Sequence, residues 1–227
     1  MTLKEAILAR HSVRRYIDKP IEPEKLNNLR SAVEEVNRAA NLNIQLVTDE
    51  PKAFAESSFL FFKYGAFSGV RNYLVMAAPN KCREDLGFYG EKLVLLAQTL
   101  GLNSCWVGLT YKEVSGVFSL RPEDKLHCVI SLGYGVNQGV QHKMKNIESF
   151  IDGSTLNTAP EWFIEGLKAV SLAPSAVNQQ KYCFSLLENN IVEVKSKISL
   201  VGYTQIDLGI AKCHFEIAAG KEHFHWK

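Results

Sequence analysis

The chain has 227 residues, of which 46% are apolar, 22% charged and 10% aromatic. This composition is that of an ordinary soluble globular protein, and it excludes collagen-like, low-complexity and mostly disordered classes. The 26 Lys and Arg against 24 Asp and Glu give a net charge of +2, so no broad field favours nucleic acid or an anionic membrane. Any bound anion must therefore be held by a local site. The length fits one large domain or two small ones.

Neither a membrane span nor an export signal is expected. The longest apolar run that reads as buried, residues 73–78, is far shorter than the roughly 20 residues of a membrane-spanning helix. Lys4, Glu5 and Arg10 interrupt the segment that would have to be the apolar core of a signal peptide, so a cytoplasmic location is the default expectation. The five cysteines are widely spaced, which indicates neither a disulfide framework nor a paired metal motif.

The first part of the chain reads as a mixture of helices and strands, separated by short loops. Apolar residues recur at helical spacing in the predicted helices, and the predicted strands alternate or are wholly apolar. A polar, aromatic-rich segment separates the first two strands. The predicted elements are a helix over 3–10, a loop over 10–16, a helix beginning at Pro20 to Pro23 and running to about Ala40, strands over 43–48 and 72–78, a helix over 80–100 capped by Gly101, and strands over 104–107 and 126–132.

A second part follows a polar, basic stretch without periodicity at residues 137–146, which is the best candidate for a linker. We therefore divide the chain into a first half (1–136), the linker (137–146) and a second half (147–227). The elements predicted for the second half are a helix over 160–172, a hairpin of strands 182–187 and 191–194 that turns at 188–190, and a final helix over 205–219. The fold class is α+β, with helices flanking a mixed, mostly antiparallel sheet.

A weak internal repeat runs through the two halves. The triplet Asp85-Leu86-Gly87 opens one long helix and Asp207-Leu208-Gly209 opens the other, with Ala97 and Ala219 in register twelve residues on. Residues 39–45 also resemble residues 173–180 with one gap. We interpret these matches as a degenerate duplication. Chance similarity is the alternative, because the identities are few.

The segment from Arg10 to Arg15 is the first candidate site. Three guanidinium groups and one hydroxyl lie within six residues, and forked, charged donors are what a phosphate monoester requires. Hydrogen bonds to a charged group contribute about 1.5 to 3 kcal/mol each, so two or three of them would anchor such a ligand. The alternative is a solvated basic turn.

Two further segments carry residues suited to a flat ligand. In residues 173–180, small side chains allow close approach, Pro174 stiffens the loop, and Asn178 offers donors and acceptors; the alternative is a helix cap formed by Ser175 or Asn178. In residues 101–109, a helix ends and a buried strand gives way to Gly108, which allows a backbone amide to face a ligand. The alternative for this segment is a structural aromatic core around Trp106.

Together, these three segments resemble the FMN-dependent nitroreductase family. Residues 10–16 (RHSVRRY) resemble its R-x-S-x-R-x-F/Y opening, residues 173–180 (APSAVNQQ) its A-P-S-x-x-N-x-Q loop, and residues 101–108 (GLNSCWVG) its G-L-G-T-C-W-x-G segment. The resemblance covers most of the chain, and the conjunction is more specific than any single motif. It implies the nitroreductase fold, FMN as cofactor, and hydride transfer from NAD(P)H to an electron-poor small molecule.

The family's site residues carry over to ten positions of this sequence. The resemblance implies that Arg10 and Ser12 hold the phosphate, that His11 makes backbone or ribityl contacts, and that Arg14 lies near the pyrimidine edge of the ring, where a cation stabilises the reduced flavin. The others would line the ring and ribityl chain or address flavin N5: Val107, Gly108, Leu109, Pro174, Ser175 and Asn178. No acid, base or nucleophile of the protein is required, because the flavin carries the chemistry.

The sequence departs from the family in the position of the A-P-S loop. Family members usually carry it directly after the second helix, whereas here residues 39–45 stand in that place and the clean copy comes in the second half. In family dimers the flavin takes one loop from each subunit, so this chain resembles a fused pseudo-dimer with one FMN. We expect a monomer, with NAD(P)H and a small-molecule acceptor as partners, and no nucleic acid or membrane. The alternatives are a flavin-binding protein without turnover and a related enzyme with another flavin reaction.

The remaining motifs favour structural roles. Residues 133–139 resemble a dinucleotide-binding G-x-G-x-x-G motif but are one residue too long and run into the linker. His223 and His225 alternate with aromatic residues, as in an edge strand, and no third metal ligand stands at a suitable spacing. Cys213 beside His214 is typical of helix packing. No metal site is expected.

Overall fold

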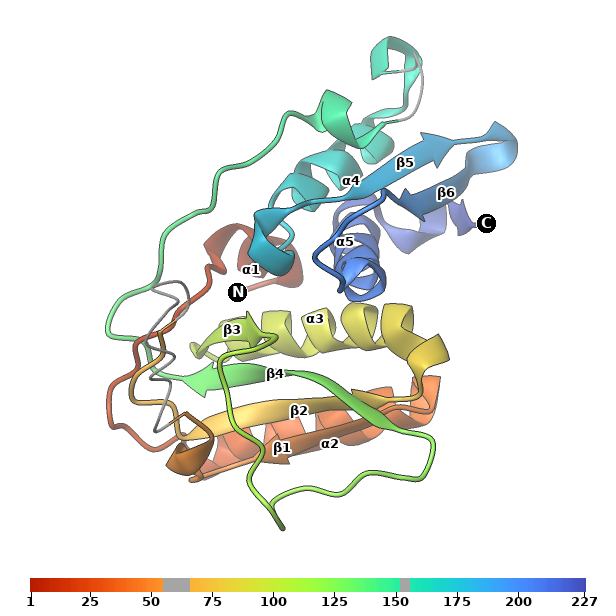
Figure 1. Ribbon diagram of the computed structural model, residues 1–227. Helices are drawn as coiled ribbons and strands as arrows, with labels where there is room; N and C mark the ends of the chain where they lie inside the picture. Colours follow the sequence, from red (N-terminus) through yellow and green to blue (C-terminus); the bar gives the residue numbers. More distant parts are fainter. Residues whose placement is uncertain (55–65, 152–155) are drawn as a thin grey trace. The chain divides into compact units, whose positions relative to one another are not determined.

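The computed structural model describes residues 1–54, 66–151 and 156–227. The aromatic-rich segment expected between the first two strands falls partly on residues 55–65, outside the described residues. The helices and strands, in chain order, are α1 (Leu3–Ala9), α2 (Pro23–Ala40), β1 (Asn43–Val47), β2 (Asn72–Ala78), α3 (Arg83–Thr99), β3 (Asn103–Val107), β4 (Lys125–Gly133), α4 (Glu161–Ser171), β5 (Tyr182–Leu186), β6 (Ile191–Ser196), α5 (Thr204–Ala219) and β7 (His225–Trp226) (Figure 1).

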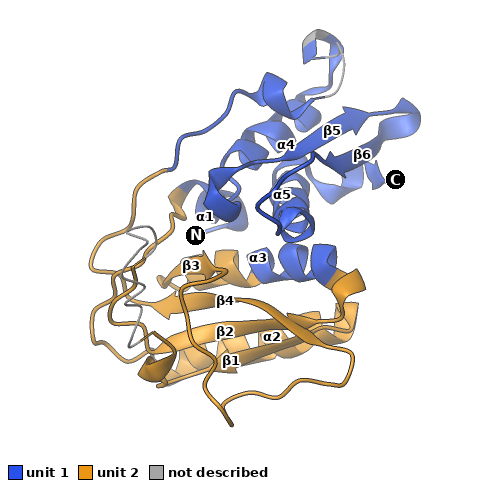
Figure 2. Ribbon diagram, viewed as in Figure 1, with its two compact units in different colours: residues 1–8, 83–92, 142–227 blue, residues 9–82, 93–141 orange. Residues whose placement is uncertain are grey.

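The described chain divides into two compact units (Figure 2). Unit 1 consists of residues 1–8, 83–92 and 142–227, and unit 2 of residues 9–82 and 93–141. The last boundary between them falls within 137–146, a stretch that forms neither helix nor strand. Helix α3 contributes its first part to unit 1 and its last part to unit 2, so each unit is assembled from segments that are distant in the sequence.

Unit 2 is built on a four-stranded antiparallel sheet in the order β1-β2-β4-β3. Every residue of β2 is buried, which explains why its sequence is an apolar run instead of an alternation. Helix α2 packs beside β1, and its buried residues recur at three- and four-residue intervals, namely Leu29, Val33 and Val36. On one face of the sheet, Tyr73 and Val75 of β2 form a core with Val13 and Tyr16 from the segment after α1. The candidate loop at residues 10–16 is thereby part of the unit 2 core.

Unit 1 encloses an aromatic core between two helices and a three-stranded sheet. Strands β5 and β6 form the predicted hairpin, and β7 extends the sheet in parallel with β6. This confirms the prediction of an edge strand around His225. Phe215 of α5 lies 5.1 Å from Phe184 of β5 and 5.5 Å from Phe163 of α4, measured between ring centroids. Close ring packing of this kind is worth more than the area it buries.

Within unit 1, α5 crosses the first part of α3 at two glycines. A Cβ atom on Gly87 would lie 2.1 Å from the carbonyl oxygen of Ile206, and one on Gly209 would lie 1.9 Å from the carbonyl oxygen of Glu84. The contact is reciprocal, because each glycine meets the residue three positions before the other glycine. These are the glycines of the two repeated Asp-Leu-Gly triplets. The triplets therefore have a structural reason, which is close approach of two helix backbones.

The observed elements match the predicted α+β class and, to within about three residues, the predicted helices and strands. The largest difference at a helix end is at α3, which begins at Arg83 and not at residue 80, because Asn80–Cys82 form a separate 3-10 turn. Helix α2 begins at Pro23, within the predicted start, and proline is favoured in the first turn, where its missing N–H is not needed. Among the described residues, none of the helices combines the length and apolar character that a membrane span requires.

Candidate functional site

The segment from Arg10 to Tyr16 is held in unit 2 by backbone hydrogen bonds to β3 and to the segment before β2. The amide of Val13 donates to the carbonyl of Ser104 (3.0 Å), and the amide of Tyr16 donates to the carbonyl of Ser68 (2.9 Å). The amide of Ser68 in turn donates to the carbonyl of Arg14 (3.0 Å). Because its backbone is paired on both sides, this segment presents its side chains from a fixed frame.

The Tyr16 side chain strengthens this frame from within the core. Its hydroxyl contacts the Val13 carbonyl and the Ser131 hydroxyl, each at 2.8 Å, and the side chain is buried. Burial raises the pKa of Tyr16 well above its ordinary value, so the phenol stays neutral. The Tyr16 hydroxyl therefore links this segment to β4 through hydrogen bonds.

Positive charge gathers beside β3. Arg10 is only 3% exposed, whereas Ser12 and Arg14 are half-buried. Burial raises the pKa of the Cys105 thiol on β3, while Arg14, the Ser12 hydroxyl and Arg10 act to lower it. The two predicted phosphate ligands, Arg10 and Ser12, and the predicted ring contact Arg14 therefore lie near one thiol. Two guanidinium groups and a hydroxyl near one strand offer the charged and polar donors that an anion requires.

His11 lies beside this cluster as a neutral ring. Its pKa is lowered mainly by burial and secondly by the charge of Arg10. At neutral pH it can donate from one ring nitrogen and accept at the other, without adding a third positive charge.

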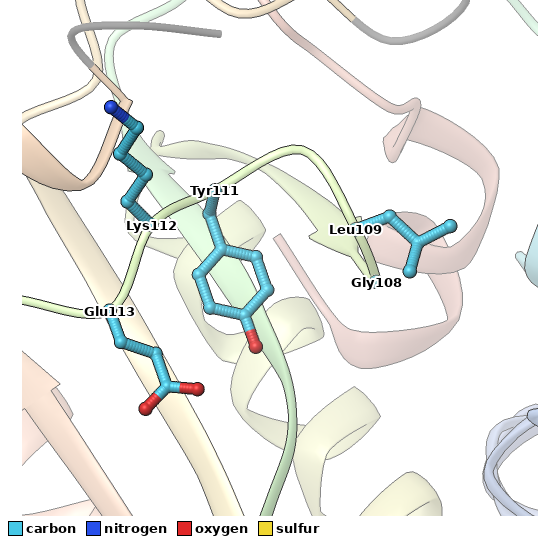
Figure 3. Close-up of a pocket in the computed structure, with 5 residues that line it drawn as sticks. All are labelled: Gly108, Leu109, Tyr111, Lys112 and Glu113. Carbon is cyan, nitrogen blue, oxygen red and sulfur yellow. The ribbon is translucent and has the colours of Figure 1, made fainter. Parts of the chain in front are cut away.

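The C-terminal end of β3 opens onto a cavity. Val107 is the last, buried residue of the strand, Gly108 follows it, and the Leu109 side chain is 80% exposed. The cavity has a volume of about 510 Å³ and is lined by Gly108, Leu109, Tyr111, Lys112 and Glu113. Figure 3 shows that Tyr111 and Glu113 point to one side of the backbone and Lys112 to the other. Gly108 lies four positions after Ser104, about 13 Å along an extended strand, which is within the reach of a mononucleotide-sized ligand.

The A-P-S loop lies in unit 1, between α4 and β5. The amide of Gln180 donates to the Ser175 hydroxyl (2.9 Å), and the Asn178 side chain donates to the carbonyl of Lys143 (3.0 Å). Pro174 is buried beneath the loop. Ser175 and Asn178 thus help to hold the loop, as the capping alternative predicted, and this does not prevent their remaining polar atoms from contacting a ligand.

The structure groups the predicted site residues by unit. Arg10, His11, Ser12, Arg14, Val107, Gly108 and Leu109 all lie along β3 or beside it in unit 2, and Pro174, Ser175 and Asn178 lie in unit 1.

Sequence reasoning missed one residue of the A-P-S loop's surroundings, Asp207 of α5. Its carboxylate accepts hydrogen bonds from the Ala176 amide (3.0 Å) and from the Gln179 side chain (2.6 Å). Asp207 is 4% exposed. The repeated Asp-Leu-Gly triplet could have drawn attention to it, but the triplet gives no sign that one aspartate is buried and the other exposed.

The other singled-out residues have structural partners. His214 is fully buried, with its Nδ1 at 3.0 Å from the Ala169 carbonyl and its Nε2 at 2.9 Å from a carboxylate oxygen of Glu91. Lys212 forms an ion pair with Glu84 at 2.6 Å. Among the described residues, no group of three or more His, Cys, Asp or Glu side chains is arranged to hold a metal ion.

Comparison with known proteins points to one family. The profile of the family described as "Putative TM nitroreductase" matches residues 2–219. A solved structure described as a "putative nitroreductase" from Thermotoga maritima MSB8 is 23% identical, with a TM-score of 0.66 over 98% of this chain and 85% of that one. No match was found among curated proteins.

Shorter structural matches share the fold. One is described as a "putative nitroreductase in complex with fmn" from Desulfovibrio desulfuricans (17% identity, TM-score 0.51, 68% of this chain and 98% of that one). Another is a "Putative NADH dehydrogenase/NAD(P)H nitroreductase" from Bacteroides thetaiotaomicron VPI-5482 (18% identity, TM-score 0.52, 65% and 94%).

Proposed function

We propose that this chain, which belongs to the nitroreductase family described as "Putative TM nitroreductase", is an FMN-dependent oxidoreductase that uses NAD(P)H to reduce an electron-poor small molecule. The observation that carries the proposal is that the segment bearing Arg10, Ser12 and Arg14 pairs with β3, and that Gly108 and a cavity follow the end of the same strand. The Desulfovibrio protein named above binds FMN, and the Bacteroides protein is named for NAD(P)H, which supports both ligands.

Arg10 and Ser12 would hold the FMN phosphate. The buried guanidinium of Arg10 supplies fixed donors, and the Ser12 hydroxyl can rotate to donate to a phosphate oxygen. Arg14 would place its charge at the pyrimidine edge of the ring, and His11 would face the ribityl chain. The backbone hydrogen bonds of residues 13–16 fix the segment that carries these donors.

Gly108 would offer its backbone amide to the flavin ring, with Val107 and Leu109 on either side. When bound, FMN accepts and releases hydride at N5. The cavity beside Gly108 would receive the electron acceptor, and Tyr111 would give it an aromatic wall.

Pro174, Ser175 and Asn178 would complete the site around the same FMN, as the resemblance implies for a fused pseudo-dimer with halves 1–136 and 147–227 joined by 137–146. The reciprocal contact of Gly87 and Gly209 supports a common origin of the halves, because two copies related by a two-fold axis make contacts of this kind. Such a chain would act as a monomer.

FMN titration tests the cofactor proposal. Purified protein should bind one FMN, with flavin absorbance retained after desalting. Arg10→Met keeps the aliphatic stem but removes the donors, and it should raise the Kd for FMN about ten- to hundredfold, as expected for a charge-assisted hydrogen bond of about 1.5 to 3 kcal/mol. Arg15→Met is the matched control, since Arg15 is exposed in the same segment and should leave the Kd unchanged. Equal effects of the two substitutions would contradict the assignment, and a wild-type protein that takes up no FMN would refute the proposed function.

Rapid mixing of the FMN-loaded protein with NADH or NADPH under anaerobic conditions tests turnover. Loss of the oxidised flavin absorbance with either nucleotide supports an oxidoreductase. Flavin that binds but is never reduced would favour the second candidate, a flavin-binding protein without turnover. Product analysis with a nitroaromatic acceptor then separates nitroreduction from another flavin reaction.

A further inference from the structure

We propose that Asp207 is a positioning residue that fixes the A-P-S loop in the conformation that receives FMN. This inference rests on the proposed function. Both carboxylate oxygens of Asp207 are used on the loop: Oδ1 accepts from the Ala176 amide at 3.0 Å, and Oδ2 accepts from the Gln179 side chain at 2.6 Å. Asp207 does not belong to any of the three motifs that carry the family resemblance.

The loop has a backbone that requires such a constraint. Val177, Asn178 and Gln180 all have positive φ angles, of 46°, 55° and 44°. Non-glycine residues adopt this region at a cost, above all a β-branched residue such as Val177, and persist there only where surrounding contacts fix them. Ala176 and Gln179, the two residues that Asp207 holds, flank Val177 and Asn178.

Asp207 can hold the loop because it is itself fixed. It lies in the first turn of α5, where the helix dipole favours a carboxylate, and its backbone amide donates to the Tyr203 carbonyl at 2.8 Å. The network continues beyond it: the Gln179 side chain donates to the Gly202 carbonyl at 3.2 Å and accepts from the Ser199 hydroxyl. One buried carboxylate thus joins α5, the A-P-S loop and the segment before α5.

The repeat supplies a natural contrast. Asp85 holds the same place in the first Asp-Leu-Gly triplet, yet it is exposed and its carboxylate accepts no hydrogen bond from the described residues. Of the two equivalent aspartates, the one that faces a candidate flavin loop is buried and doubly bonded. This is the difference expected if position 207 was retained for the loop and position 85 for the helix start alone.

Three variants test the proposal: Asp207→Ala, which removes both acceptors; Asp207→Asn, which keeps an oxygen for the Ala176 amide and loses only the acceptor for Gln179; and Asp85→Ala as the matched control. We expect Asp207→Ala to raise the Kd for FMN at least tenfold and to speed hydrogen exchange at the Ala176 amide at least tenfold. Asp207→Asn should stay close to wild type in both measurements, and Asp85→Ala should change neither.

The two readouts separate this proposal from the proposed function. Wild-type protein that binds no FMN would refute the function, while exchange at Ala176 would still report whether Asp207 holds the loop. Asp207→Ala that binds FMN with wild-type affinity and exchanges Ala176 at the wild-type rate would overturn the proposal. If Asp207→Ala unfolds globally, Asp207→Asn becomes the deciding variant. The proposal requires Asp207→Asn to bind FMN within a few-fold of wild type and to keep the Ala176 amide protected from exchange. Loss of both FMN binding and protection in Asp207→Asn would overturn the proposal.

Discussion

Burial raises the pKa of the Asp207 carboxyl to about 6 from an ordinary value of 3.8, against the opposing effect of its bonds to Gln179 and Ala176. Tyr182 of β5 stays neutral over this range, because burial raises its pKa. Because the folded-state pKa lies above the unfolded one, the folded state binds more protons in this window, and stability falls as pH rises from about 4 to above 6. Over the full pKa shift from 3.8 to about 6, the free energy of unfolding falls by about 3 kcal/mol.

We therefore predict that Asp207→Asn becomes more stable relative to wild type as pH rises. Between pH 5 and pH 8 the difference in unfolding free energy should move by about 1 to 2 kcal/mol in favour of the variant, because only wild type develops the buried charge. Urea denaturation of both proteins at the two pH values measures this difference, in which the other titrating groups cancel. A constant difference would show that Asp207 does not titrate in this range.

Glu91 and His214 form a second buried pair, between α3 and α5 of unit 1. Each side chain is 0% exposed, with Nδ1 of His214 3.0 Å from the Ala169 carbonyl oxygen and its Nε2 2.9 Å from a carboxylate oxygen of Glu91. Glu91→Leu alone leaves a buried imidazole nitrogen without its partner and should destabilise the protein by about 3 to 5 kcal/mol. Adding His214→Leu should recover about 2 kcal/mol or more of that loss. Chemical denaturation of both variants measures the recovery, and additive losses would contradict the coupling.

These residues show why the sequence predicts only part of the site. Arg10, Ser12, Arg14 and Gly108 stand in local motifs, so their chemistry and spacing were readable. Asp207 and Glu91 act through burial, which depends on which helix faces they occupy once α3 and α5 have packed. No local pattern separates the buried Asp207 from the exposed Asp85, since both open a helix with the same triplet.

At the scale of elements, the crossing of α3 and α5 depends on Gly87 and Gly209. We predict that Gly209→Ala destabilises the protein by 3 kcal/mol or more, because the new methyl would meet the Glu84 carbonyl oxygen and the Phe88 amide of α3, and a helix backbone cannot move aside as a side chain can. Gly101→Ala is the control: Gly101 also has a backbone that disfavours alanine (φ +76°), but nothing lies within 4 Å of the added carbon. It should cost about 1 kcal/mol. Thermal and urea denaturation compare the two, and equal losses would argue against close helix contact.

The elements themselves were predictable because their burial is periodic. The spacing of Leu29, Val33 and Val36 marks α2, and the apolar run at 72–78 marks a central strand. The order β1-β2-β4-β3 was not predictable, and for β7 the sequence indicated an edge strand around His225 without its partner or its length. Strand order is fixed by contacts between residues distant in the sequence, and β7 is too short to show a period.

At the scale of the whole molecule, the sequence predicted a cut between two halves near residue 141, while the structure gives unit 1 a segment from each side of it. Residues 83–92 of α3 lie with residues 142–227, where Glu91 meets His214 and Gly87 meets Ile206. A polar linker is a natural place to divide a sequence. It gives no sign that part of α3, which precedes the linker, completes the core formed by the residues that follow it.

This arrangement predicts how the chain responds to cleavage. A protease site inserted between Gln141 and His142 should, once cut, yield two fragments that co-elute on size exclusion as one folded monomer-sized species and separate only in denaturant. Residues 142–227 expressed alone should fail to fold, because His214 and the glycine face of α5 would lack their partners on α3. Circular dichroism with thermal melting of the isolated fragment checks the second part. A cooperative melt of residues 142–227 alone would show that the segment of α3 is dispensable, and separation of the cut chain without denaturant would show that unit 1 does not bridge the cut.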